Sequence, residues 1–295
     1  MEAGTCRQSL FLEQVNECET FQEKQRMLNE CINRKGGIEM SFFNKVLASI
    51  GIGAAKVDTK LEKPEYTAGE TIRGQVEISG GSTEQQIDSI YLTVYTTFIR
   101  EADDRKYTDH AAVKKHKLNE PFKIGVNEKK SIPFSMELPI DTPITYGNTR
   151  VWVATGLDIK NAADPGDKDY IEVRPTTLAA SVLDAIGQLG FRLREVECEQ
   201  ASKRIGSRFP FVQEFEFVPT SGPFRGKLDE LEVSFLAQAK EKAELLIQVD
   251  RKARGIGGLF AEALEMDETL LRLTVTSQDV PRLDEKLKNE IARYA

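Results

Sequence analysis

The sequence predicts a mainly β protein in which two antiparallel β-sandwiches follow one another and a helix ends the chain. Three observations predict this fold. Apolar and polar residues alternate over residues 57–173 and again over residues 209–275, as in strands that bury one face. Short Pro- and Gly-rich turns separate the alternating stretches, as they do in all-β sandwiches. Helical spacing returns at the end, in residues 281–294.

The first 39 residues differ in composition from the rest of the chain. They contain no Pro and many Glu, Gln and Asn, with a few apolar residues at loosely helical spacing. Paired glycines at residues 36 and 37 would end a helix there. We therefore expect residues 1–39 to form an extension that is helical or poorly ordered, and the working protein to begin at Met40.

Residues 41–52 (SFFNKVLASIGI) are predicted to form a short amphipathic helix. Its first residue, Ser41, is a suitable N-cap. We expect the apolar stripe of this helix to pack on the domain that follows. The alternative is that Phe42, Phe43 and Ile50 anchor the chain at a membrane surface, although the segment contains a single basic residue.

The first β-sandwich is predicted to occupy residues 40–175. Its longest strand covers residues 90–98, where Ile, Leu, Val, Thr and Phe share one face. Turn motifs such as Gly80-Gly81 separate the strands, and Arg174-Pro175 closes the block.

The second β-sandwich is predicted to occupy residues 176–278. It begins with helical spacing over residues 176–189, where a Thr can cap the helix. A second alternating series then runs from Phe209 to Val275, without repeating the sequence of the first.

The C-terminal helix is predicted to occupy residues 279–295. Asp279 can cap it, and Pro281 suits its first turn. Its apolar face is the candidate partner-binding site, formed by Leu283, Leu287, Ile291 and Tyr294. The alternative, which we favour, is that this face packs on the second sandwich.

Composition and charge exclude several classes of protein. Lys and Arg number 40 against 47 Asp and Glu, a net charge of −7, which argues against nucleic acid as a partner. No apolar run approaches the roughly 18 residues of a transmembrane helix, and the N-terminus lacks a signal sequence. Four Cys without a CxxC pair predict reduced thiols, with Cys198 half-buried on a strand. We therefore expect a cytoplasmic protein without an integral membrane segment.

No catalytic motif stands out. The two histidines, His110 and His116, lie among lysines, and no GxSxG motif is present. The Gly-rich segment at residues 255–258 is interpreted as a hairpin connection, with a binding loop as the alternative. The acidic segment Asp158–Glu172 lacks the calcium-loop register. We predict no catalytic, cofactor or metal site, and keep a metal-dependent hydrolase using Asp158–Glu172 as an alternative.

Two resemblances give the chain a family. The segment KPEYTAGETIRGQVEISGG (Lys63–Gly81) resembles the second-strand signature of arrestin-type domains, which is matched by Pro64, Tyr66, Gly69, Glu70, Gly74 and Val76. Separate segments, among them DPGDKDYIEVRP, SRFPFVQEFEFVP and FRGKLDELEV, resemble bacterial sporulation-control proteins of the Spo-zero-M type. This second resemblance runs from Met40 to Ala295.

The resemblance implies two arrestin-like β-sandwiches and a regulator of sporulation and cell division, with no enzymatic activity and no cofactor. We therefore expect a cytoplasmic scaffold that binds proteins of the regulatory or division machinery. It would reach the membrane or the division septum only peripherally, and it would pair with a second copy as a homodimer. A peripheral membrane adaptor remains the alternative.

Overall fold

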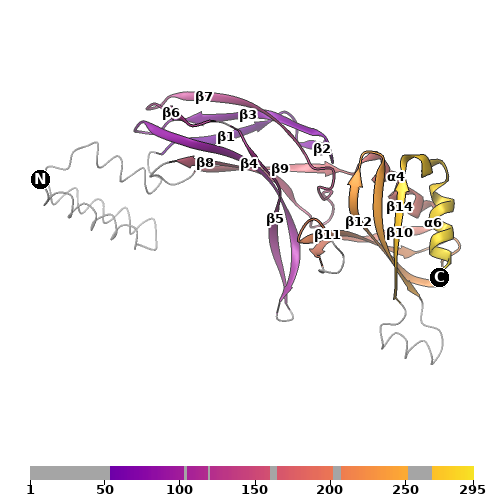
Figure 1. The fold of residues 1–295 in the computed structure, drawn as a ribbon. Helices are drawn as coiled ribbons and strands as arrows, with labels where there is room; N and C mark the ends of the chain where they lie inside the picture. The colour runs from indigo at the N-terminus through magenta and orange to yellow at the C-terminus, as the bar shows by residue number, and fades with distance from the viewer. Residues whose placement is uncertain (1–53, 103–104, 119, 160–164, 202–206, 252–267) are drawn as a thin grey trace, which may run out of the picture.

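The computed structural model describes residues 54–102, 105–118, 120–159, 165–201, 207–251 and 268–295. The extension predicted for residues 1–39, the helix predicted for residues 41–52 and the Gly-rich segment lie outside the described residues. The described chain forms two β-rich units, of which the N-terminal one is drawn in indigo to pink and the C-terminal one in rose to yellow (Figure 1).

The N-terminal unit contains the strands β1 (Lys56–Leu61), β2 (Glu65–Thr67), β3 (Thr71–Ser79), β4 (Gln85–Ala102), β5 (Arg105–Lys117), β6 (Phe122–Ile124), β7 (Lys129–Glu137), β8 (Val151–Ile159) and β9 (Gly166–Arg174). Strands β1, β3 and β7 form one antiparallel sheet. Strands β5, β4, β8 and β9 form the facing sheet, to which β6 and β2 add at its margins. This unit is an antiparallel sandwich whose core is filled by the alternate apolar side chains of both sheets.

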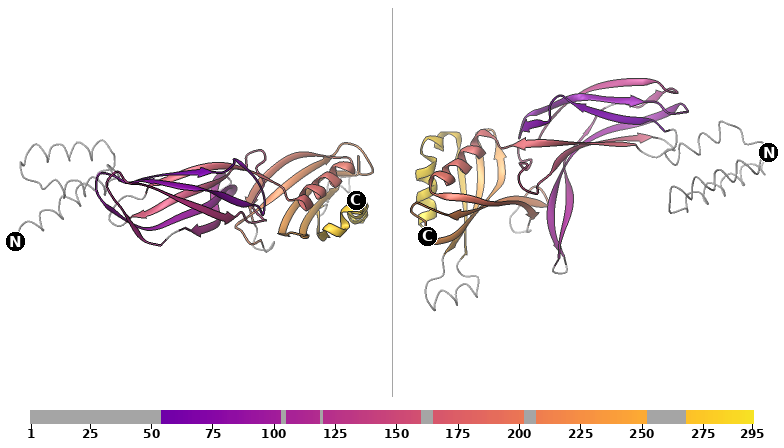
Figure 2. Two further views of the ribbon diagram at one scale, coloured as in Figure 1. Left: turned by 90° about the horizontal axis from the view of Figure 1, so that it is seen from above. Right: turned by 180° about the vertical axis from the view of Figure 1, so that it is seen from behind.

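The C-terminal unit contains α4 (Thr177–Gln188), β10 (Phe191–Gln200), β11 (Phe211–Pro219), β12 (Leu228–Ala239), β13 (Lys242–Arg251), β14 (Glu268–Thr276), the 3₁₀ helix η1 (Ser277–Arg282) and α6 (Leu283–Ala292). Strands β10 to β14 pair in order as an antiparallel meander. Helices α4 and α6 lie together on one face of this sheet (Figure 2). The helices therefore provide the second layer, where a sandwich would have a second sheet.

The prediction of a mainly β chain with two β units and a C-terminal helix is confirmed. The structure differs from the prediction in the second layer of the C-terminal unit, which consists of helices and not of a second sheet. The physical reason lies in α4, whose Leu178, Val182 and Ile186 are buried against the sheet. Thr176 caps α4, since its Oγ1 accepts a hydrogen bond of 3.1 Å from Ala179 N. The chain then turns at Gly190, whose φ of +92° favours glycine.

The two units share one sheet and part of one core. Strand β10 pairs in parallel with β4 at Glu199 and Ile99, which joins the C-terminal strands to the N-terminal sheet. Cys198 and Phe211, which belong to β10 and β11, are buried in the core of the N-terminal unit. Ile144 packs against both cores. The first core therefore extends beyond residue 175, where the sequence suggested a boundary.

Candidate interaction surfaces

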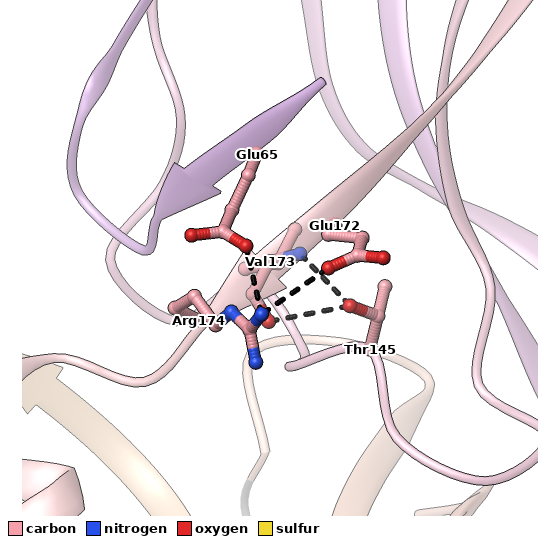
Figure 3. A network of polar contacts seen from close by, with 5 residues as sticks. All are labelled: Glu65, Thr145, Glu172, Val173 and Arg174. Atoms are coloured by element: carbon pink, nitrogen blue, oxygen red, sulfur yellow. Dashed lines mark hydrogen bonds and ion pairs between the residues drawn. The ribbon is translucent and has the colours of Figure 1, made fainter. Parts of the chain in front are cut away.

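The end of β9, where the chain leaves the N-terminal unit, is held by a polar network (Figure 3). Parallel pairing places Glu65 of β2 beside Glu172 of β9. The Arg174 guanidinium lies 2.8 Å from Glu65 Oε2 and 3.4 Å from Glu172 Oε2, and it lowers the pKa of Glu65. On the other side of β9, Val173 N donates to Thr145 Oγ1 at 2.9 Å, and Thr145 N donates to Val173 O at 3.1 Å. These bonds fix the loop that carries Thr145 against the last residues of β9.

A second set of contacts spans the two units. Gln213 of β11 makes two hydrogen bonds with the Ile144 backbone, accepting from its N–H at 2.9 Å and donating to its carbonyl at 2.8 Å. Arg208 lies 3.0 Å from Asp141. The crevice between these contacts leaves a volume of about 40 Å³, which suits one or two waters. The junction is therefore a packed joint and does not offer a ligand pocket.

An open groove lies beside this joint on the N-terminal unit. It has a volume of about 630 Å³ and is lined by Pro64, the loop residues 145–151 and the β9 residues 170–172. Its two tyrosines, Tyr146 and Tyr170, are 52% and 58% exposed. Exposed aromatic side chains beside a concave surface are typical of protein-binding sites. We call this feature the tyrosine groove.

The loop of the tyrosine groove has a defined conformation. Gly147 adopts a φ of +54°, and Thr149 N donates to Tyr146 O at 3.0 Å, which closes a turn. The Arg150 guanidinium donates to the carbonyl oxygens of Gly147 at 2.7 Å and Thr149 at 3.1 Å. The loop therefore presents Tyr146 from a fixed backbone.

The predicted partner-binding residues of the C-terminal helix lie in the core. Leu283, Leu287 and Ile291 are at most 2% exposed and contact the second core, and Tyr294 is half-buried against it. Binding a partner through this face would require α6 to leave the sheet. The helix itself starts later than the sequence indicated, because Asp279 lies in η1, where it accepts hydrogen bonds from the N–H and the hydroxyl of the N-cap Thr276, and α6 begins only at Leu283.

Two described carboxylates of the segment Asp158–Glu172, those of Asp167 and Asp169, lie close to each other, and Glu172 points to a different partner. Glu172 contacts Arg174, whereas Asp167 accepts a hydrogen bond of 2.7 Å from Thr59 N. Burial and the nearby carboxylates of Asp167 and Asp58 raise the pKa of Asp169 to about 6. Among the described residues, no three His, Cys, Asp or Glu side chains are grouped so as to hold a metal ion.

The other sequence candidates have ordinary surroundings or fall outside the described residues. Burial raises the pKa of the Cys198 thiol to about 12, and Thr149 Oγ1 donates to it at 3.7 Å. The thiol is fully buried, where a half-buried position was expected. Phe42, Phe43 and Ile50 lie outside the described residues. No helix in the described part of the chain combines the length and the apolar character needed to cross a membrane.

Sequence reasoning missed the tyrosine groove and the Gln213 contact. The groove combines Pro64 with two segments that lie about 80 and 100 residues further along the chain. The one local signal was Tyr146 next to Gly147, a pair that could have indicated a turn with an exposed tyrosine. Gln213 stands within an alternating strand, where its spacing predicts a core residue.

These features define a class of protein: a mainly β chain of two linked units, whose tyrosine groove is formed by loops and the edge of a sheet. The chain belongs to the Spo0M family, because the family described as SpoOM protein matches residues 43–253. It is 43% identical over 259 residues to the sporulation-control protein spo0M of Bacillus subtilis (strain 168), covering 87% of this chain and 100% of the relative.

A solved structure agrees with this assignment. The crystal structure of Spo0M, sporulation control protein, from Bacillus subtilis matches with a TM-score of 0.73 and 39% identity, over 83% of this chain and 100% of that chain. The resemblance to sporulation-control proteins is thereby confirmed, and the two-domain, arrestin-like description is consistent with the fold.

Proposed function

We propose that this protein is a non-enzymatic regulator of sporulation, with a further role in cell division, that acts by binding other proteins. The observation that carries the sporulation role is the 43% identity to a sporulation-control protein along the whole of that relative. In the segment Asp158–Glu172, Glu172 is paired with Arg174 and Asp167 accepts a hydrogen bond from Thr59 N, which supports a binding role over hydrolysis.

The tyrosine groove is the surface that we propose for partner binding. Its occupant is an extended segment of a partner protein that contributes an apolar side chain and a carboxylate. The apolar side chain would lie between Tyr146 and Tyr170, two residues that are more than half exposed. The carboxylate would bind Arg150, whose guanidinium contacts backbone carbonyls and forms no ion pair with a carboxylate of the described residues.

A photo-crosslinking experiment tests this proposal in cells. A photoreactive amino acid replaces Tyr146 in the full chain, and a matched variant carries it at Tyr107, a 43% exposed tyrosine of β5 outside the groove. We expect a protein to crosslink from position 146 and not from position 107 in sporulating cells. Deletion of that protein should reproduce the sporulation defect of Tyr146→Ala.

Two results would contradict the proposal. Equal crosslinking from positions 146 and 107 would show that the tyrosine groove is not the partner-binding surface. Normal sporulation by Tyr146→Ala, in cells where deletion of the gene impairs sporulation, would show that the groove has no regulatory role. Tyr107→Ala is the control for nonspecific effects of losing an exposed tyrosine.

A further inference from the structure

Four aromatic rings cross the outward face of the N-terminal sheet. They belong to His110 of β5, Tyr95 of β4, Trp152 of β8 and Tyr170 of β9. Tyr95 and Trp152 are register partners and stack at 5.6 Å, and Trp152 lies opposite Tyr170 with ring centroids 5.9 Å apart. His110 meets Tyr95 edge-on at 5.8 Å. Cross-strand ring contacts of this kind hold the side chains in place, so the row is an ordered part of the surface.

The neighbouring row of the same face has a lysine at each end and short side chains between them. Register places Lys115 of β5 opposite Thr93 of β4. It places Ala154 of β8 between Thr93 and Lys168 of β9. Both lysines are exposed, whereas Thr93 is 6% exposed and Ala154 is half-buried. The two charges therefore stand on the outer strands, with no bulky side chain in the row between them.

Both lysines lie over aromatic rings and lack a counter-ion. Lys168 Nζ is 4.0 Å from the Trp152 ring centroid and 4.5 Å from that of Tyr170. Lys115 Nζ is 3.9 Å from the ring centroid of Tyr91 on β4. Within the described ranges, neither ammonium group has a carboxylate within 4.0 Å. We call the two rows, together with Tyr91, the lysine–aromatic face.

A segment that carries carboxylates fits this face. A carboxylate can bind the Lys168 ammonium while the ammonium stays over the Trp152 ring, so the cation–π contact does not have to break. The same holds for Lys115 over Tyr91. In an extended segment, alternate side chains point to one side about 7 Å apart. Such a segment with carboxylates at alternate positions presents several of them to the face at once.

Carboxylates border the face on the side of the C-terminal unit. Ile99 of β4 and Glu199 of β10 are register partners, so their side chains share one side of the sheet, and alternation places Tyr95 there too. Glu197 is on this side as well and lies directly opposite Glu214 of β11. Burial and the nearby glutamates raise the pKa of Glu214 to about 7, as expected where negative charge is in surplus. A negatively charged ligand is therefore confined to the N-terminal sheet.

A nucleic acid strand fits the face less well than an acidic segment does. Ammonium groups already lie over the Trp152 and Tyr91 rings, where bases would stack. A long chain of phosphates would also run onto the carboxylates of Glu197 and Glu199. A short acidic segment of a protein ends before it meets them.

We propose that the lysine–aromatic face binds an extended acidic segment of a partner protein, with carboxylates on Lys115 and Lys168. This contact goes beyond the proposed function, which assigns an apolar side chain and one carboxylate of a partner to the tyrosine groove. The face adjoins the groove at Tyr170, but its charges and its other rings lie outside the groove. It can therefore be tested apart from the groove.

Fluorescence anisotropy with the full chain measures the binding of labelled peptides. The acidic probe alternates Glu and Thr over about ten residues, long enough to cross the sheet. Two matched probes carry Gln or Lys in place of Glu. We expect the acidic probe to bind, its affinity to fall as salt rises, and the Gln and Lys probes not to bind.

A double variant tests the two lysines. Lys115→Gln with Lys168→Gln removes both ammonium groups and should raise the dissociation constant of the acidic probe at least about tenfold. Lys115→Arg with Lys168→Arg keeps both charges and should retain binding. The control, Lys56→Gln with Lys129→Gln, removes two exposed lysines of the opposite sheet and should bind as the wild type does.

Trp152 reports where the probe binds, because it is the only tryptophan of the chain and lies beneath Lys168. Its emission should change when the acidic probe binds to the wild type, and should not change in Lys115→Gln with Lys168→Gln. Tyr146→Ala, which alters the groove alone, should bind the probe as the wild type does. Loss of binding in Tyr146→Ala would place the probe in the groove and overturn the proposal.

Three further results would overturn the proposal. The first is no binding of the acidic probe at about 1 mM. The second is equal binding by Lys115→Gln with Lys168→Gln and by its control, which would place the contact elsewhere. The third is tighter binding of a single-stranded thymidine oligonucleotide that also depends on Lys115 and Lys168, which would assign the face to nucleic acid. None of these results bears on crosslinking from position 146, so the tyrosine groove would stand or fall separately.

Discussion

Burial and neighbouring charges shift the pKa values of individual carboxyl groups in this protein. Glu214 and Asp169 both have raised pKa values, to about 7 and about 6, because burial disfavours their charged forms and other carboxylates lie near them. Lys286 has the opposite effect on Asp279, whose pKa is lowered by a direct ion pair of 2.9 Å. The raised values mark sites where charge costs stability at neutral pH.

Glu214→Gln should stabilise the protein at pH 8 and have little effect near pH 4.5. Folding raises the pKa of Glu214 from 4.5 to about 7, so the native state binds this proton more tightly. The contribution of Glu214 to the free energy of unfolding therefore falls as pH rises from about 4.5 to about 7. A like-charge cross-strand pair costs up to about 1 kcal/mol, which corresponds to roughly 2–4 °C.

Thermal unfolding followed by circular dichroism at both pH values measures this change. The matched control is Glu241→Gln, an exposed glutamate in the turn between β12 and β13. A gain in melting temperature that is the same at pH 4.5 and pH 8 would contradict the role assigned to the Glu214 charge.

At the scale of elements, α6 is a structural layer of the C-terminal unit. Its three buried side chains contact the same core as α4 and the sheet. Lys286 holds the N-terminal end of α6 in place, because it donates a hydrogen bond to Thr274 O at 2.9 Å and forms an ion pair with Asp279. Removing α6 would therefore expose the sheet face that it covers.

Leu287→Ala should lower the free energy of unfolding by about 2–5 kcal/mol, since Leu287 is fully buried and its removal leaves a cavity. Urea unfolding measures the loss, and Lys288→Ala, an exposed neighbour, should leave stability nearly unchanged. Equal stability of the two variants would show that α6 does not depend on this contact.

The sequence was sufficient to predict the strands and helices that bury one face and expose the other. Period-two alternation in β4 and β13 and the 3–4 spacing of α6 follow from that burial. It was not sufficient for the role of α4, because helical spacing does not tell which sheet face a helix covers. The rings of Trp152 and Tyr170 meet through strand register, and the tyrosine groove joins distant segments, so neither has a local signal.

At the scale of the whole molecule, the joint between the units decides whether they unfold together. Ile144 packs against both cores, and Gln213 makes two hydrogen bonds to its backbone. Cys198 and Phe211 of the C-terminal strands lie in the first core, where the Phe211 and Phe98 rings are 5.9 Å apart. The units are therefore coupled by packing as well as by chain connection.

Gln213→Ala should weaken this coupling. It leaves the N–H and carbonyl of Ile144 without these partners, which costs about 1–3 kcal/mol. We expect calorimetry to show one transition for the wild type and a broadened or split transition for the variant. Gln188→Ala, at the exposed end of α4, is the control and should unfold as the wild type does. An unchanged single transition in Gln213→Ala would show that the joint does not depend on this side chain.

The sharing of the first core has a consequence for how the protein is made. Phe211 is 3% exposed within that core, and it lies 37 residues beyond the end of β9 at Arg174. While the chain is being synthesised, the N-terminal sandwich therefore lacks two of its inner side chains until Phe211 has left the ribosome. The nascent first half carries an unfilled interior and an uncovered margin of β4 during that interval, when it is most exposed to aggregation and to chaperones.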